Sequence, residues 1–225
     1  MYEELEAVLD DLESPSIERV IGRNFHRGVL HGHETIAVVA GIGKTAVATT
    51  TTLLIQHFGA GAILLTGAAG RVSEELAVGD VVVASHLVHH DLDASPIFPR
   101  YHVPALGIAE LETDAAFSAL AHAASESFVA EEAAGARVAT GLVLSGDQFM
   151  GPAALEDLRR RFPHGLAVEM EGAAVAQVCV EGEVPFAVVR SISDDGDAGS
   201  FERFLRGDCG RYARGIVGRL LLASS

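Results

Sequence analysis

Cysteine and positive charge are both scarce in this chain of 225 residues, and each scarcity excludes a class of protein. The two cysteines, Cys179 and Cys209, form no CxxC pair, so the sequence shows neither a disulfide scaffold nor an oxidising compartment. Against 31 aspartates and glutamates stand only 16 lysines and arginines. The formal net charge of −15 makes nucleic acid or an anionic membrane surface an unfavourable partner.

Long apolar runs are missing as well. No run approaches the roughly 18 residues that suffice to cross a bilayer, and residues 1–4 (MYEE) do not resemble a signal peptide. We therefore expect a cytoplasmic protein. What is present is a balance of 49% hydrophobic and 21% charged residues, which is typical of a globular chain. The length suits one domain that covers residues 1–225.

Apolar segments alternate with segments of helical spacing along the chain. Strands are expected at residues 35–40, 62–66, 81–88, 137–144, 166–168 and 186–192, a strand or hairpin at 17–29, and helices at 2–12, 44–58, 112–132, 153–162, 171–181 and 201–222. This alternation predicts an α/β sandwich with a largely parallel sheet. The irregular segment 92–110 is longer than most connections, which makes it a candidate for function.

Acidic residues stand where two of the expected strands end. Residues 168–174 (VEMEGAA) place Glu169 and Glu171 at a strand-to-helix junction, and residues 189–194 (VRSISD) end a strand with Asp194. Ligands of α/β proteins bind beyond the carboxyl ends of the strands. These acids therefore predict a small-molecule site in which one carboxylate holds the ligand and another moves a proton. An acid at a helix start is also favourable without a ligand, which accounts for one glutamate better than for the pair.

Two glycine-containing turns remain open between a ligand role and a packing role. Residues 41–46 (GIGKTA) lack the earlier glycine of a phosphate-binding loop, because Val38 stands there, and no acid ends the next strand to bind a nucleotide ribose. Their backbone amides either face a ligand or only close a tight turn. Residues 67–70 (GAAG) either let a flat ring approach the backbone or pack a helix closely on a strand.

Histidines and a Phe-Met pair carry weaker signals. His86, His89 and His90 lie on or after one strand, but no second ligand cluster with metal spacing appears, so we interpret them as loop or edge histidines and expect no metal. Phe149 and Met150 follow another strand end. They either pack in the core or form one wall of a slot for an aromatic base.

Together these motifs resemble the nucleoside phosphorylase superfamily, and most closely its 5′-methylthioadenosine/S-adenosylhomocysteine nucleosidases. The matching segments occur in the same order and at similar spacing, at residues 41–44, 66–70, 78–82, 145–149, 168–171 and 190–194. The resemblance implies a three-layer α/β/α sandwich with a central mixed sheet and no need for a metal or redox cofactor. It also implies an adenine nucleoside as small-molecule partner and a homodimer in which a neighbour's loop completes the 5′ pocket.

The resemblance further implies a role for individual residues. Asp194 matches the general acid that protonates N7 of adenine, Glu171 matches the residue that binds the ribose hydroxyls, and Glu4 matches the glutamate that activates the attacking water. The implied substrate contacts are Phe149, the backbone of Met150, Met170, Glu169, Ser193, Arg190, Phe201, Ala68, Gly70 and Ile42.

Departures from the family pattern keep other activities open. The short apolar strand that usually precedes the position of Glu4 is not found, and Ala68 and Arg71 replace a serine and a glycine. Leu65 stands where phosphorylases carry a phosphate-binding arginine, which favours water as the nucleophile, although Arg71 keeps phosphorolysis open. A nucleoside-binding module without turnover is the third alternative. The accepted 5′ substituent also stays open, because residues 97–107 do not match the family's segment.

Overall fold

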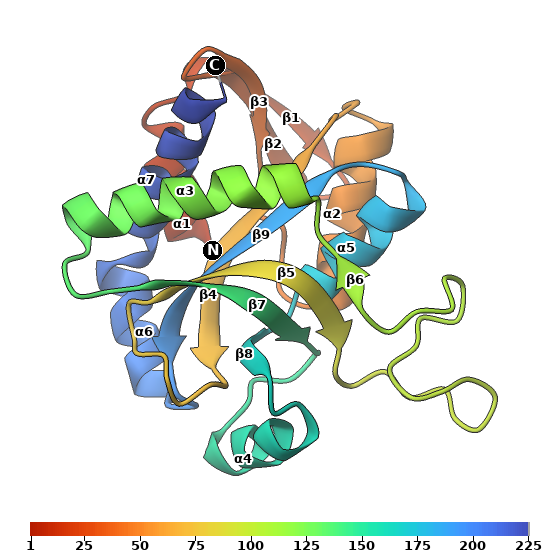
Figure 1. Ribbon diagram of the computed structural model, residues 1–225. Helices are drawn as coiled ribbons and strands as arrows, with labels where there is room; N and C mark the ends of the chain where they lie inside the picture. The colour runs from red at the N-terminus through yellow and green to blue at the C-terminus, as the bar shows by residue number, and fades with distance from the viewer. Residues whose placement is uncertain (225) are drawn as a thin grey trace.

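The fold is built on two β-sheets surrounded by helices (Figure 1). The computed structural model describes residues 1–224, with a three-stranded antiparallel sheet (β1-β2-β3) beside a six-stranded sheet in the order β6-β5-β7-β8-β4-β9. The strands are β1 (Glu13–Val20), β2 (Arg23–Leu30), β3 (His33–Ala37), β4 (Ile63–Arg71), β5 (Val81–His89), β6 (Leu111–Glu112), β7 (Val138–Ser145), β8 (Gly165–Glu169) and β9 (Phe186–Asp194). The helices are α1 (Tyr2–Leu9), α2 (Lys44–Gln56), α3 (Ala115–Glu132), α4 (Pro152–Arg161), α5 (Gly172–Glu181), α6 (Ala198–Gly207) and α7 (Cys209–Ala223).

The larger sheet is mixed and curls on itself. β4 runs parallel to β9, and β7 runs parallel to both β5 and β8. The pairs β4–β8, β5–β6 and β5–β9 are antiparallel, so the sheet is less uniformly parallel than the alternation of elements predicts. Because β5 pairs with both β7 and β9, strands β5, β7, β8, β4 and β9 close into a ring, which leaves fewer unpaired strand edges.

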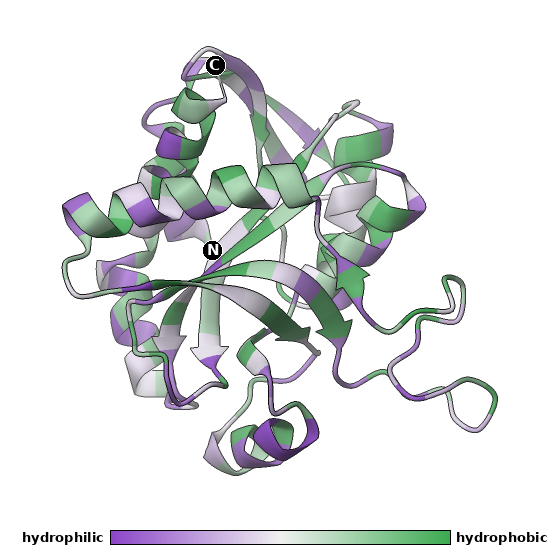
Figure 2. Ribbon diagram, in the orientation of Figure 1, coloured by the Kyte–Doolittle hydropathy of each residue, from purple (hydrophilic) through white to green (hydrophobic). Residues whose placement is uncertain are grey.

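Helices cover both faces of this sheet. On one face, Val47 of α2 and Val175 of α5 pack in a core cluster with Ile192 of β9. On the other face, Phe128 of α3 and Tyr212 of α7 meet with ring centroids 4.8 Å apart. Figure 2 shows hydrophobic residues along β9, as expected for a strand that is buried on both faces.

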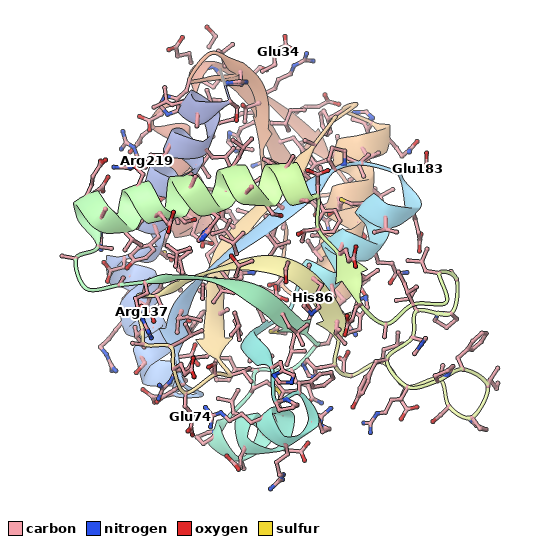
Figure 3. The ribbon with its side chains drawn as sticks, in the orientation of Figure 1. Glu34, Glu74, His86, Arg137, Glu183 and Arg219 are labelled. Atoms are coloured by element: carbon pink, nitrogen blue, oxygen red, sulfur yellow. The ribbon has the colours of Figure 1, made fainter. Side chains whose placement is uncertain are left out.

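Charged side chains lie mostly at the periphery. Glu34, Glu74 and Glu183 are exposed at the rim of the molecule (Figure 3). Arg219 of α7 pairs with Glu131 at 2.5 Å and so ties α7 to α3 at the surface. None of the described helices is both long enough and apolar enough to span a membrane.

Several element boundaries differ from the sequence prediction: β3 is shifted to His33–Ala37 from residues 35–40, and α1 ends at Leu9 and not at residue 12. Three further differences have a clear physical reason. β4 continues past residue 66 to Arg71, because its small residues keep pairing with β9 as far as Asp194. The helix predicted from residue 112 begins only at Ala115, because the carboxylate of Asp114 caps it by accepting a hydrogen bond from the backbone N–H of Phe117 at 2.7 Å. The helix predicted over residues 201–222 is two helices, α6 and α7, which are interrupted at the weak helix former Asp208.

Candidate active site

A cavity of about 810 Å³ extends from β2, β3 and the end of α7 along β4 to the ends of β4, β8 and β9. The sheet register explains why these ends meet, since Gly70 of β4 pairs with Val168 on one side and with Asp194 on the other. Nearly all the residues that the sequence singles out line this cavity: Glu4, Ile42, Ala68, Gly70, Phe149, Glu169, Met170, Glu171, Arg190, Ser193, Asp194 and Phe201. Asp194 and Glu171 therefore line the same cavity, which is necessary if both act on one ligand.

Met150 is the predicted contact residue that lies outside this lining. Its side chain is buried in a cluster with Leu155 and Leu158. Its carbonyl oxygen faces Gly196, where a Cβ would lie 3.1 Å from it. A contact between a ligand and the backbone of Met150 stays a prediction.

Arg190 and Glu169 are among the most deeply buried charged residues of the site. Their side chains form an ion pair and are 3% and 2% exposed. Glu169 also accepts hydrogen bonds from the backbone N–H groups of Glu171 at 3.0 Å and Gly172 at 2.8 Å, and from the hydroxyl of Ser145. These contacts join β7, β8, β9 and the start of α5. Sequence reasoning missed the role of Ser145, although a hydroxyl at a strand end was the available signal.

Glu171 is held from two sides at the start of α5. Its Oε1 accepts a hydrogen bond from the backbone N–H of Gly43 at 2.9 Å, and its Oε2 lies 3.4 Å from the guanidinium of Arg190. Burial raises the pKa of Glu171, and the positive charge of Arg190 offsets part of that rise. The site thus holds a carboxylate where little water screens it, so its charge acts strongly on a bound ligand.

The glycine turn before α2 binds carboxylates of the protein itself. Besides the contact from Gly43 to Glu171, the backbone N–H of Lys44 donates to Asp147 Oδ1 at 2.7 Å. Gly41 and Gly43 have φ angles of +91° and +89°, in the left-handed region that glycine adopts without strain. The sequence left open whether the amides at this helix start face a ligand. One of them positions Glu171, because the helix dipole favours a negative charge at the N-terminus.

Asp194 ends β9 with its carboxyl group against β4. It is 3% exposed, and its Oδ1 accepts a hydrogen bond from the backbone N–H of Gly196 at 2.8 Å. The hydroxyl oxygen of Ser193 lies 2.8 Å from Asp194 Oδ2 and 3.2 Å from the carbonyl oxygen of Ala69. A Cβ at Gly70 would lie only 3.3 Å from Oδ1, so the absence of a side chain there keeps space beside the carboxyl group.

Glu4 reaches the same cavity from α1. It is 7% exposed, and its Oε2 contacts the backbone nitrogen of Met1. A Cβ at Gly67 would collide with the guanidinium of Arg190 and lie 3.8 Å from Glu4 Oε1. Gly67 is thus the spacer that lets Glu4 and Arg190 approach each other across β4.

Two aromatic rings form the outer part of the cavity wall. The centroids of Phe149 and Phe201 are 6.1 Å apart with an interplanar angle of 67°, an edge-to-face arrangement. Phe149 is 52% exposed, so part of its ring is free to meet a ligand. Together with Met170 on the lining, these rings suit a flat aromatic group.

The histidines of β5 and the residues after it are not assembled into a metal site. A ring nitrogen of His86 lies 2.7 Å from the hydroxyl of Ser85. His89 and His90 are buried, and burial lowers the pKa of both. Within residues 1–224, no group of three His, Cys, Asp or Glu side chains is arranged to hold a metal ion.

Known proteins share this fold. A family model described as the phosphorylase superfamily matches residues 1–221. The 5′-methylthioadenosine/S-adenosylhomocysteine nucleosidase of Bacillus cereus is 39% identical over 196 residues, which cover 86% of this chain and 82% of that protein.

Solved structures of such nucleosidases agree closely with it. The enzyme from S. pneumoniae with the transition-state inhibitor MT-ImmA gives a TM-score of 0.89 at 32% identity, covering 100% of this chain and 96% of that one. The enzyme from Colwellia psychrerythraea in complex with adenine gives a TM-score of 0.90 at 32% identity, covering 98% and 91%. These similarities confirm the predicted fold type, a central mixed sheet with flanking helices.

The raised pKa of Glu171 predicts a pH-dependent gain in stability for Glu171→Gln. Because the folded protein binds this proton more tightly than the unfolded chain, stability falls as pH rises from the usual value of 4.5 through the folded pKa. Glutamine removes that loss, which is about 1.4 kcal/mol for each pKa unit. Urea denaturation should therefore show the variant to be more stable than the parent at pH 8, and by a smaller margin at pH 5.

Glu202→Gln is the matched control, because Glu202 is an exposed glutamate on α6. It should show little change at either pH. A Glu171→Gln protein that is less stable than the parent at pH 8 contradicts the account, since the attraction to Arg190 would then outweigh desolvation.

Proposed function

The chain belongs to the phosphorylase superfamily, among its 5′-methylthioadenosine/S-adenosylhomocysteine nucleosidases, and we propose that it hydrolyses the N-glycosidic bond of such adenine nucleosides and releases adenine. The observation that carries this proposal is that Asp194 and Glu171 line one cavity together with two aromatic rings, Phe149 and Phe201. The family match over residues 1–221 also supports our proposal that residues 1–225 form one nucleoside phosphorylase-like domain.

In the proposed reaction, the two acids act at opposite ends of the breaking bond. Asp194 donates a proton to N7 of adenine, so that the base leaves neutral, and a positioned acid contributes about 10²–10⁴-fold to the rate. Glu171 accepts hydrogen bonds from the ribose hydroxyls. Its negative charge stabilises the oxocarbenium-like sugar more strongly in the transition state than in the bound substrate.

The remaining residues position the reactants. Glu4 orients the water that attacks the sugar and takes its proton, while Arg190 and Glu169 frame the site around Glu171. The proposed contacts to the nucleoside are Met170 at the ribose, Phe149 with the Met150 backbone and Phe201 at the adenine, and Ile42, Ala68, Gly70 and Ser193 around them.

The hydrogen bonds around Asp194 fix the orientation of its carboxyl group. The hydroxyl of Ser193 has one proton and two neighbours within hydrogen-bond distance, Asp194 Oδ2 and the carbonyl of Ala69. Ser193 Oγ and the backbone N–H of Gly196 therefore contact both oxygens of Asp194 and hold the carboxyl group in the position from which it would donate to the base.

Water is the proposed nucleophile, because the nearby guanidinium groups are engaged by the protein. Arg71, which kept phosphorolysis open, donates to the carbonyl of Leu76 at 2.9 Å and to Asp195 at 3.2 Å. Arg190 is held by Glu169 and by Glu171. Each of the two guanidinium groups is thus already paired with a carboxylate of the protein, which would compete with phosphate for it.

Adenine release should not depend on phosphate. The purified protein, incubated with 5′-methylthioadenosine in phosphate-free buffer, is expected to release adenine at the same rate as with added phosphate. Chromatography of base and sugar products measures this. Strict dependence on phosphate, with a sugar 1-phosphate as product, would contradict the choice of water, and tight binding without any adenine would favour a binding module.

Asp194→Asn should abolish turnover while substrate binding survives. Asparagine keeps the shape of the side chain but has no acidic proton, so kcat is expected to fall by about 10²-fold or more. Steady-state kinetics measure kcat, and calorimetry with the uncleaved nucleoside measures binding. The matched control is Asp195→Asn, because Asp195 is adjacent, half exposed and outside the cavity lining. Equal activity of the two variants would remove Asp194 from its role.

We also propose that the protein is a homodimer. Ile97 and Phe98 are 82% and 40% exposed on the 92–110 segment, which extends away from the body of the molecule in Figure 1. A second copy would cover this apolar surface. Light scattering is expected to give twice the chain mass of 23.5 kDa, and Ile97→Asp should shift it toward the single-chain mass. A parent protein that already has the single-chain mass would contradict the proposal.

A further inference from the structure

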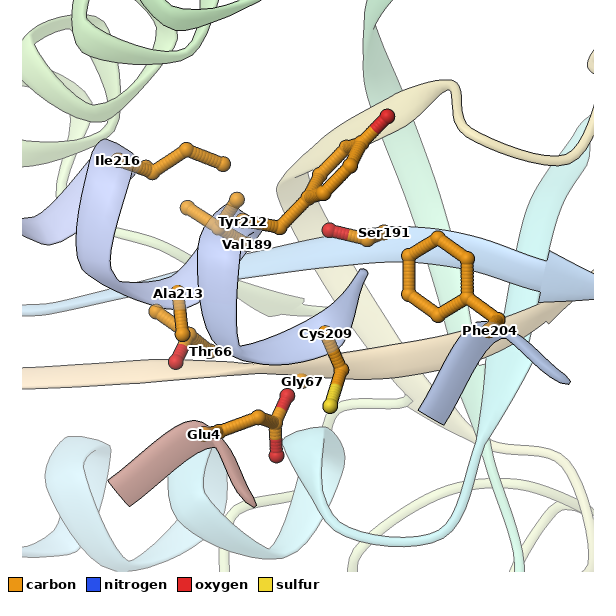
Figure 4. Close-up of a pocket in the computed structure, with 10 residues that line it drawn as sticks. All are labelled: Glu4, Thr66, Gly67, Val189, Ser191, Phe204, Cys209, Tyr212, Ala213 and Ile216. Atoms are coloured by element: carbon orange, nitrogen blue, oxygen red, sulfur yellow. The ribbon is translucent and has the colours of Figure 1, made fainter. Parts of the chain in front are cut away.

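A second, much smaller cavity adjoins Glu4. Its volume is about 10 Å³, and it is enclosed between α1, β4, β9 and α7 with the start of α7 at one end (Figure 4). The residues that line it are Glu4, Thr66, Gly67, Val189, Ser191, Phe204, Cys209, Tyr212, Ala213 and Ile216. Glu4, Thr66 and Gly67 also line the large cavity, and Glu4 is the one ionisable residue that the two linings share.

The alternation of side chains along two parallel strands creates this cavity. On β9, Val189 and Ser191 point toward α7, while Arg190 between them points toward the ion pair with Glu169. Thr66 of β4 pairs with Val189, so the hydroxyls of Thr66 and Ser191 lie on the same face of neighbouring strands. The chain thus places two hydroxyl groups under α7, in an otherwise apolar layer.

These two hydroxyl groups lack hydrogen-bond partners among the described residues. In the described part of the chain, neither the hydroxyl of Ser191, a residue only 6% exposed, nor that of the half-buried Thr66 makes a hydrogen bond to protein. Buried polar groups are normally paired with protein or with ordered water. A volume of about 10 Å³ is at the lower limit of what admits one water molecule. A site for buried water also needs two to four polar partners.

We propose that this cavity binds one structural water molecule, which holds the carboxylate of Glu4 in one orientation. The water would donate one proton to Glu4 and the other to one of the two hydroxyls, and would accept a hydrogen bond from the second hydroxyl. Ser191 and Thr66 are then positioning residues, which act on the reaction only through Glu4. The inference rests on the proposed function, because it gives Glu4 the task of orienting the attacking water.

A water that holds the carboxylate of Glu4 in one orientation would help the proposed reaction. One oxygen of Glu4 contacts the nitrogen of Met1, and no side chain of the described residues donates a hydrogen bond to its other oxygen. A base that must receive a proton in one direction works best when its carboxylate cannot rotate. A water bound in the small cavity would fix that orientation without occupying the space in which the nucleoside binds.

The first test removes the hydroxyl that lines only the small cavity. Ser191→Ala is expected to lower kcat about tenfold, less than the 10²-fold that a misplacement of roughly 1 Å can cost, with KM for the nucleoside unchanged. Thr66→Val should act in the same way, whereas Thr66→Ser, which keeps the hydroxyl, should restore kcat. The control is Ser125→Ala, because the buried hydroxyl of Ser125 bonds only to the carbonyl of Ala121 in its own helix.

The second test locates the water directly. A crystal structure of the parent protein is expected to show one ordered water within hydrogen-bond distance of Ser191 Oγ and the Glu4 carboxylate, and a crystal structure of Ser191→Ala should lack it or show it displaced. A dry cavity in the parent overturns the proposal, as does an unchanged kcat in both Ser191→Ala and Thr66→Val. A rise in KM with kcat intact also overturns it, since the hydroxyls would then act at the nucleoside.

These outcomes separate the water site from the proposed function. If the parent releases no adenine, the proposed function fails whatever the cavity holds. If the parent releases adenine and its cavity is dry, only the present inference fails.

Discussion

The buried ion pair between Arg190 and Glu169 is the interaction on which the rest of the site depends. Removing one member of such a pair leaves an uncompensated buried charge, which costs about 3–5 kcal/mol. Through Ser145 and the amides at the start of α5, this pair joins β7, β8 and β9 at their ends. It also gives the two nearby carboxylates, Glu169 and Glu171, different roles. The oxygens of Glu169 accept hydrogen bonds from the protein, whereas Glu171 lines the cavity, where a ligand can reach it.

The positions at which β4 and β9 end determine where the acidic residues of the site lie. Parallel β4 and β9 run in register until Gly70 meets Asp194, so the acid arrives beside a strand that has no side chain to block it. Glycine at position 67 serves the same purpose for Glu4 and Arg190. The result is a largely buried site in which an acid, a carboxylate and a second glutamate surround one cavity. Water competes poorly there, so each charge acts on a bound nucleoside with little screening.

Much of this site could be predicted from the sequence, because its carboxylates stand at strand ends that local periodicity reveals. The VEME and SISD segments mark both the elements and the acids, whereas most other site residues were predicted from the family resemblance. Twelve of the thirteen predicted residues line the cavity, with Met150 outside it. Non-local contacts were harder. The extension of β4 depends on its ladder with β9, and the amides of Gly43 and Lys44 are used by Glu171 and Asp147, more than one hundred residues later in the chain. No local pattern encodes such pairings.

The central claim is that a proton from Asp194 reaches N7 of the purine and allows it to leave. A 7-deaza analogue of 5′-methylthioadenosine, which has carbon in place of N7, tests this claim most directly. The analogue should bind with an affinity close to that of the natural nucleoside, because the ribose and ring contacts remain, yet release of its base should be undetectable. Cleavage of the analogue at a rate comparable to that of 5′-methylthioadenosine would contradict the account.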